Sequence, residues 1–212
     1  CTCAGAPPFT RAHAMSCNKA GYLTARHNEV RNLIGALAKE VTSEVANDPV
    51  IRKGVAATDD RSAIPELKAD LLIQGFWEND SEKVVCIDFC VHDTDAASSS
   101  REVRTALSRK EASKRLKYFL ECSKRGMSFS PFAMAAAEGS LGPAAMIILN
   151  RLSKLLAAKW NRKVASIRSW IQTRIAFAVM RGTSLCLRGS RQSWRKLGLY
   201  DYGWEGVRGQ FL

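Results

Sequence analysis

The stretch that decides the fold is "KADLLIQGFWENDSEKVVCIDFCV", from Lys68 to Val91. Its two apolar runs, "ADLLI" and "KVVCIDFCV", predict two buried strands joined by the polar connection "WENDSE". Each run carries one acid, Asp70 in the first and Asp88 in the second. Two buried carboxylates on neighbouring strands repel each other unless a cation lies between them. The stretch therefore favours an oxygen-liganded Mg²⁺ or Mn²⁺ site, and the alternative is that one acid only caps a strand end.

The chain on either side of this stretch predicts an α/β protein. Apolar residues at helical spacing predict a helix from Thr24 to about Val45, which "NDP" (Asn47 to Pro49) ends. After the acidic strands, Ser99 or Ser100 is expected to cap a second helix, and Gly126 to end it. We expect further elements as follows: a weak extended segment near 50–57, a strand over 127–134, and amphipathic helices over 142–160 and 164–188.

The second predicted helix carries lysines that fit the acids. Lys110, Lys114 and Lys117 recur at spacings of four and three residues and so share one helix face. A lysine near a bound metal ion acts as an electrostatic partner for the attacking water or the scissile phosphate. Because this helix directly follows the second acidic strand, the lysines are candidates to complete a hydrolytic site. The alternative is that they only face solvent.

The net charge of +12 is unevenly distributed. Between Gly139 and Tyr200 the chain has 12 Lys and Arg residues and no Asp or Glu. Such a segment suits a polyanion such as nucleic acid, or is simply a solvated helix face. The aromatic and basic tail, 191–212, either stacks on bases or packs on the core. No apolar run reaches the length of a membrane span. We predict nucleic-acid contacts for the following residues: Arg26, His27, Arg31, Arg162, Lys163 and Arg168.

The N-terminal segment combines thiols with an imidazole. Cys1, Cys3, His13 and Cys17 form a complete tetrahedral zinc set, and the alternative is a disordered, Cys-rich end. Seven cysteines in all, most of them in apolar stretches, indicate a reducing compartment rather than a disulfide framework. Because the chain begins at Cys1 without Met, we expect it to be a segment of a longer polypeptide.

Seven short motifs occur in a fixed order. They are the Cys/His cluster, "RHN" (Arg26–Asn28), "KAD" (Lys68–Asp70), "IDF" (Ile87–Phe89), "KRLKY" (Lys114–Tyr118), "SPFAM" (Ser130–Met134) and "GSLG" (Gly139–Gly142). Over roughly residues 1–180, this order resembles the restriction-like endonuclease domain of site-specific non-LTR retrotransposons. That domain is a branch of the PD-(D/E)XK nuclease superfamily and opens with a Cys/His zinc knuckle.

The resemblance implies a restriction-endonuclease-like α/β core, built from a helix, a mixed central sheet, a helix and a strand. It also implies an N-terminal zinc knuckle and a C-terminal helical extension. The expected division is a zinc knuckle over 1–20, the endonuclease core over 21–140, a basic helical extension over 141–190 and a basic, aromatic tail over 191–212.

For the site, the resemblance implies that Asp70 and Asp88 are ligands of Mg²⁺ or Mn²⁺, together with the backbone carbonyl of Phe89. The superfamily motif has a lysine two residues past the second acid, where this chain has Cys90. The following helix then supplies that function through Lys114 and Lys117, with Tyr118 beside them.

The implied activity is Mg²⁺-dependent nicking of a DNA target that primes reverse transcription by a retroelement. The implied setting is nuclear, within a larger polyprotein that carries a reverse transcriptase, with DNA and the element's RNA as partners and a structural Zn²⁺.

Two other functions stay open from the sequence. One is a catalytically degenerate, zinc-stabilised domain that binds nucleic acid without cutting it. The other is a stand-alone host nuclease with a restriction-like core. In addition, His92, Asp93 and Asp95 follow the second acidic strand and form either a polar loop or a separate metal site.

Overall fold

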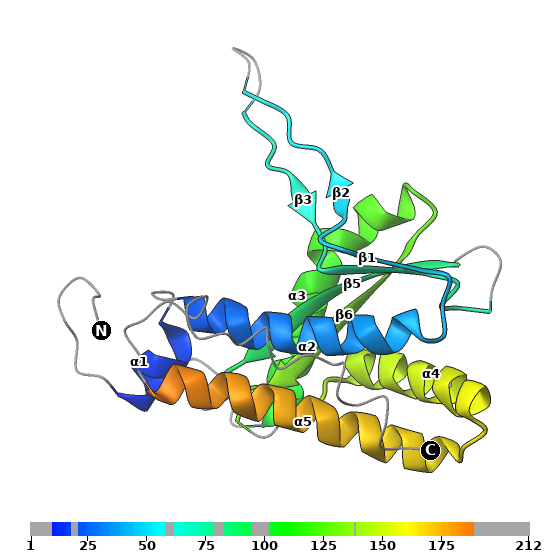
Figure 1. Cartoon of the computed structure of the whole chain (residues 1–212). Coiled ribbons are helices and arrows are strands. Elements are labelled where there is room, and N and C mark those ends of the chain that lie inside the picture. Colours follow the sequence, from blue (N-terminus) through cyan, green and yellow to red (C-terminus); the bar gives the residue numbers. More distant parts are fainter. Residues whose placement is uncertain are drawn as a thin grey trace.

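The computed structural model describes residues 10–17, 21–57, 62–78, 83–94, 102–137 and 139–188. Within these ranges the chain is a mixed α/β protein, as predicted (Figure 1). Its elements are α1 (Arg11–Ser16), α2 (Tyr22–Lys39), β1 (Glu44–Asn47), β2 (Val50–Arg52), β3 (Leu67–Lys68), β4 (Leu71–Gln74), β5 (Val84–His92), α3 (Val103–Ser123), β6 (Ser128–Ala135), α4 (Pro143–Trp160) and α5 (Val164–Arg188).

A mixed sheet of four strands, in the order β1-β4-β5-β6, forms the centre. β4 pairs antiparallel with both β1 and β5, whereas β5 and β6 are parallel because α3 connects them as a crossover. In the β4–β5 ladder the last pair is Leu71 opposite Ile87, and Asp70 and Asp88 are the next residues beyond it. The prediction of a mixed central sheet is confirmed.

The helices cover the two faces of the sheet unequally (Figure 1). Side chains alternate along a strand, so Val85, Ile87 and Phe89 of β5 point to one face and Cys86 and Asp88 to the other. The first three join one large apolar cluster with residues of α2, α4 and α5. Cys86 instead packs in a smaller cluster with residues of α3. Asp88 is therefore directed toward α3.

Three predicted boundaries differ from the structure. The first long helix ends at Lys39, and Val45 belongs to β1 rather than to the helix. The spacing of four residues did not distinguish the two, because side chains four residues apart share a side in both a helix and a strand. The strand predicted as one run is split at residues 69 and 70: β3 pairs with β2 in a separate two-stranded sheet, and β4 joins the main sheet. α3 begins at Val103, so its cap is not a serine; both serines predicted as caps lie outside the described residues.

Helix α5 approaches α2 closely where Gly182 faces Arg26. A Cβ atom added to Gly182 would lie 2.6 Å from Cγ and 2.7 Å from Cα of Arg26. Arg26 itself is only 3% exposed. A glycine at this position thus allows the two helices to bury the arginine between them.

We predict that Gly182→Ala destabilises the protein by more than about 1 kcal/mol, because the new methyl group overlaps the backbone of α2. The sign is informative, since Gly to Ala inside a helix ordinarily stabilises by about 0.5–1 kcal/mol. Denaturant unfolding measures the difference, with Ser184→Ala in the exposed part of the same helix as the matched control. If Gly182→Ala were as stable as the native protein or more stable, α2 and α5 would not approach each other this closely at Gly182.

Candidate active site

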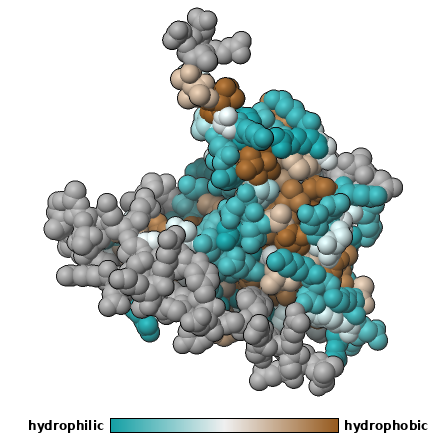
Figure 2. Space-filling view, turned by 45° about the horizontal axis from the view of Figure 1, so that its top comes forward, coloured by the Kyte–Doolittle hydropathy of each residue, from teal (hydrophilic) through white to brown (hydrophobic). Residues whose placement is uncertain are grey.

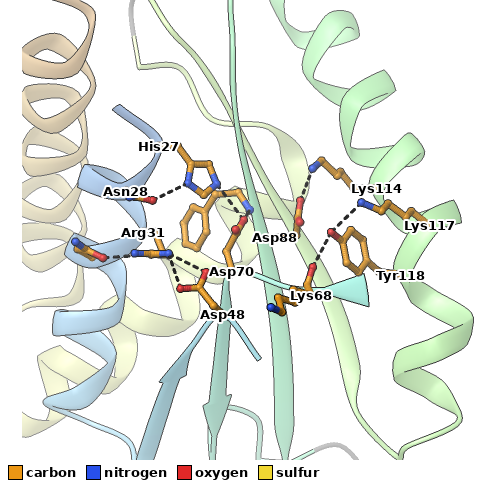
Figure 3. Close-up of polar contacts among 12 residues, drawn as sticks. His27, Asn28, Arg31, Asp48, Lys68, Asp70, Asp88, Lys114, Lys117 and Tyr118 are labelled. Carbon is orange, nitrogen blue, oxygen red and sulfur yellow. Dashed lines mark hydrogen bonds and ion pairs between the residues drawn. The ribbon is translucent and has the colours of Figure 1, made fainter. Parts of the chain in front are cut away.

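The two acids of the opening stretch lie directly beyond the last residue pair of the β4–β5 ladder, Leu71 and Ile87. The amide of Asp70 donates to the carbonyl of Ile87 at 3.1 Å, so the chain stays bonded to β5 here but leaves the register of the ladder. Asp70 is also the point at which the chain leaves the small β2–β3 sheet and enters the main sheet. Figure 3 shows both carboxylates between α2 and α3, each facing a basic side chain.

Asp70 is held from the α2 side of the sheet. Its Oδ2 accepts a hydrogen bond of 2.6 Å from the amide of Phe89, and Nε2 of His27 donates to the same oxygen at 3.0 Å. Burial alone would raise the pKa of Asp70. The bond and charge of His27, the Phe89 amide and the charge of Lys114 outweigh burial and lower this pKa. Asp70 is therefore ionised at neutral pH.

His27 is fixed at both ring nitrogens. Its Nδ1 lies 3.3 Å from Oδ1 of Asn28, and its ring packs edge-on against Phe89 with a centroid distance of 6.3 Å. Burial alone would lower the pKa of His27, but the hydrogen bond and charge of Asp70 outweigh it and raise the pKa above the ordinary 6.5. The "RHN" motif thus supplies an orienting partner for the first acid.

Asp88 is held from the opposite side of the sheet, by α3. It is 4% exposed, and its buried Oδ2 accepts no hydrogen bond of regular geometry. The ammonium of Lys114 lies 2.5 Å from this oxygen. Burial alone would lower the pKa of Lys114, but its bond to Asp88 outweighs burial and raises it. Lys114 is thus a charged partner of the second acid.

Lys117 and Tyr118 lie beside this pair. The hydroxyl of Tyr118 donates to the carbonyl of Lys68 at 2.9 Å and accepts from Nζ of Lys117 at 3.2 Å. Burial, and then the nearby Asp88, raise the pKa of Tyr118 far above its ordinary value, so it stays protonated. Tyr118 therefore ties α3 to the residues before Asp70, and Lys117 remains exposed to solvent.

The donor set at Asp70 and Asp88 fits a hard divalent cation. Among the described residues there is no group of three or more His, Cys, Asp and Glu side chains that could hold a metal ion. A cation here would have two carboxylates as its side-chain ligands, with main-chain oxygen and water completing the shell. Mg²⁺ is commonly bound in this way, and at Oδ2 of Asp88 such a cation would compete with the ammonium of Lys114.

The predicted DNA-contacting residues on α2 have partners within the chain. Arg26 is buried under α5, so it offers no surface to a duplex in this structure. Arg31 forms an ion pair with Asp48 at 2.9 Å, on the side of α2 that faces the start of β2. His27 contacts Asp70, as described above. This part of α2 thus supports the site from within.

The predicted basic residues after α4 lie away from the acids. Arg162, Lys163 and Arg168 are near the α4–α5 turn, and Lys159 just before it pairs with Glu40 beyond the end of α2. His27 is in the second turn of α2, about 20 Å back along the axis at 1.5 Å per residue. The structure therefore does not bring these three residues to the site.

The predicted zinc ligands are only partly described. His13 lies on α1 and Cys17 directly follows that helix, whereas Cys1 and Cys3 lie outside the described residues. The zinc site stays a prediction. The second polar cluster is likewise incomplete, because His92 ends β5 but Asp95 is not described.

Glu111 is a supporting residue that the sequence analysis missed. Its carboxylate is buried and accepts hydrogen bonds from the amides of Ala144 and Ala145, in the first turn of α4, at 3.1 Å and more. Burial raises the pKa of Glu111 despite these bonds. The start of α4, Gly142 followed by Pro143, has no side-chain cap of its own. The missing cap was the sequence signal that another residue must accept hydrogen bonds from the first amides of this helix.

Comparisons with known proteins do not assign this chain. No protein-family model matches it, and no curated protein matches it. In the described part of the chain, the helices include none long and apolar enough to cross a membrane.

We predict that the pKa of His27 lies above 6.5 in the metal-free protein and falls below 6.5 in Asp70→Asn. The reason is that burial then acts without the opposing carboxylate. Two-dimensional NMR of the ring protons against pH measures this, since the chain has three histidines. His92, whose pKa burial lowers, serves as the internal control.

The same pair links stability to pH. The raised pKa of His27 contributes stability below 6.5 that is lost as pH rises through the folded-state value. The lowered pKa of Asp70 contributes stability above 3.8 that is lost as pH falls through its folded-state value. Asp70→Asn should therefore lose most stability, relative to the native protein, between pH 3.8 and 6.5. A pH-independent difference would contradict the ion pair.

Proposed function

We propose that this chain is a metal-dependent endonuclease domain that nicks DNA. One observation carries the proposal: two acids, Asp70 at the entry to β4 and Asp88 on β5, lie just beyond the same end of the β4–β5 ladder, and the ammonium of Lys114 contacts the second. Paired acids with a lysine are the constellation expected for hydrolysis of a phosphodiester with a divalent cation.

The element order supports the restriction-endonuclease-like core that the sequence resemblance implies. That core was expected as a helix, a mixed central sheet, a helix and a strand. The chain runs through α2, the strands β1, β4 and β5, the helix α3 and the parallel strand β6. The two acids lie in the centre of this order, on β5 and at the entry to β4.

In the proposed mechanism, Asp70 and Asp88 would hold Mg²⁺ or Mn²⁺, with the Phe89 carbonyl as the expected third ligand. The cation would supply Lewis-acid chemistry, which lowers the pKa of a water and neutralises charge on the phosphate. Lys114 contacts Asp88, so its ammonium would orient the attacking water or stabilise the charge that develops on the phosphate. As the water oxygen bonds to phosphorus, the P–O bond to the leaving strand breaks; the proton of the water passes to solvent, and the leaving oxygen takes a proton from solvent. His27 keeps Asp70 in position.

The wider setting is proposed from the sequence resemblance. The nick would prime reverse transcription by a retroelement in the nucleus, with the chain forming part of a larger polyprotein. The partners would be DNA and, during priming, the element's RNA. A structural Zn²⁺ would be held by Cys1, Cys3, His13 and Cys17. The basic residues near the α4–α5 turn would then contact nucleic acid at a distance from the cut.

A second candidate is a degenerate domain that binds nucleic acid and does not cut. It is favoured by Cys90, which stands on β5 where the superfamily motif has lysine. Burial raises the pKa of this thiol, so it offers no charge to the site.

We predict that Asp88→Asn lowers the rate of Mg²⁺-dependent nicking of supercoiled plasmid by more than about 100-fold while DNA binding is retained. Loss of supporting residues around a metal costs about 10–100-fold, and a direct ligand should cost more. Asp48→Asn is the matched control. Asp48 is an exposed acid near Asp70, and Asn tolerates its φ of 51°.

The controls separate the two candidates. A native protein that binds DNA but nicks in neither Mg²⁺ nor Mn²⁺ would contradict the endonuclease and support the degenerate domain. Equal losses in Asp88→Asn and Asp48→Asn would indicate a general effect of charge rather than a metal ligand.

We further predict that Lys114→Met lowers the nicking rate more than Lys117→Met does. Lys114 contacts Asp88, whereas Lys117 is exposed and contacts Tyr118. Single-turnover nicking at saturating protein compares the two variants, and thermal unfolding checks that each is folded. A larger loss from Lys117→Met would assign the catalytic lysine to that position instead.

A further inference from the structure

A two-stranded ribbon, here called the arm, projects from the body of the protein next to the site (Figure 1). Its described residues are 50–57 and 62–68. β2 and β3 pair antiparallel at its base, and farther out the amides of Val55 and Ile64 each donate to the other residue's carbonyl at 2.8 and 2.9 Å. The arm is thus a hydrogen-bonded ribbon rather than an irregular loop.

The outer part of the arm contacts little of the chain. All described residues from 53 to 66 are exposed, including Val55 (57%) and Ile64 (45%). Figure 2 shows hydrophobic residues along the arm where it stands away from the body. Nothing in the described part of the chain covers these side chains, so they are open to a contact outside it.

The base of the arm is firmly attached to α3. Ile51 and Leu67 are buried in the same apolar cluster as Tyr118 of α3. The guanidinium of Arg125, just after α3, donates to the carbonyl of Val50 at 3.3 Å. Arg52 lies 3.7 Å from Glu121 of α3. The direction of the arm is therefore fixed relative to the helix that carries Lys114.

The arm also leads directly into the acids. The carbonyl of Lys68, the last residue of β3, accepts the Tyr118 hydrogen bond, and Asp70 follows two residues later. Its described charged residues are Arg52, Lys53, Lys68 and Glu66. Lys68 pairs with Glu66 at 2.7 Å, and Arg52 lies 3.7 Å from Glu121. The surface is thus continuous from the arm to the site.

We propose that the arm lies in the major groove of duplex DNA beside the scissile phosphate, with Val55 and Ile64 against the base edges. A major groove admits a two-stranded ribbon, and apolar side chains contact the thymine methyl group there. Lys53, next to the base, contacts a flanking phosphate, which positions the ribbon. This inference rests on the proposed function, because it takes duplex DNA as the substrate.

Continuity with the proposed site favours DNA over a protein partner. A duplex with one phosphate at Asp70 and Asp88 extends past the point at which β3 meets β4, and the base of the arm is there. A second copy of the chain, held through the apolar residues of the arm, is the competing occupant that the experiment must detect.

The test is photo-crosslinking from the arm. Benzoylphenylalanine is placed at position 55 or 64 of the full chain carrying Asp88→Asn, and the protein is irradiated with a labelled duplex of random sequence in EDTA. We expect crosslinks to DNA from both positions. Position 147 on α4 is the control, because Ile147 is 56% exposed but lies away from the arm. Crosslinks to a second protein chain, or equal DNA crosslinking from position 147, would overturn the proposal.

Affinity provides a second measurement. Val55→Asp with Ile64→Asp should weaken binding to the same duplex by at least about tenfold, through lost base contacts and repulsion from phosphates. Ile147→Asp, which introduces the same change at similar exposure, should have little effect. Because all these side chains are exposed, thermal unfolding should be nearly unchanged. Unaltered affinity in the double variant would overturn the proposal.

The outcomes separate the arm from the endonuclease. A native protein that nicks plasmid without crosslinking from the arm would overturn this inference and leave the proposed function intact. A protein that crosslinks from positions 55 and 64 but never nicks would support the arm and contradict the endonuclease.

Discussion

The structure depends on how a buried acidic side chain, that of Asp88, is paired. An unpaired buried charge costs several kcal/mol, and Lys114 supplies the compensating charge at 2.5 Å. Because Lys114 lies on the crossover helix between β5 and β6, this pair also fixes that helix against the sheet. Glu111, three residues earlier, binds the first turn of α4. The Lys114–Asp88 pair therefore holds α3 against the sheet, and the nearby Glu111 contact holds α4 against α3.

Asp70 is stabilised from the other layer of the fold. It lies where the chain passes from one sheet to the other, and its carboxylate is bound by His27 of α2 and the amide of Phe89. The two acids consequently face each other with a cationic side chain on each side. A divalent cation between them would meet an arrangement already oriented by both helical layers, which reduces the reorganisation needed on binding.

Local sequence patterns predicted the later helices and strands well. They did not predict features that depend on contacts between distant parts of the chain. Gly142 and Pro143 marked the start of α4, and an apolar run indicated that β5 is buried. The split between β3 and β4 was not predictable, because it reflects a change of partner strand rather than a local signal. Arg26 was expected at the surface because of its charge, but Gly182 on a distant helix makes room to bury it. The contact of Glu111 with Ala144 joins residues that are 33 positions apart, so no local sequence pattern could predict it.

The position of the lysine follows from the geometry of β5. Residues 88 and 90 of a strand point to the same face, and here that face is covered by α3. A lysine on the strand at position 90 and a lysine on the facing helix can therefore direct an ammonium toward the same carboxylate. In this chain Cys90 fills the strand position as a neutral thiol, and Lys114 delivers the charge from α3. The proposed site thus keeps the charge at one point in space while the residue that supplies it lies on a different element.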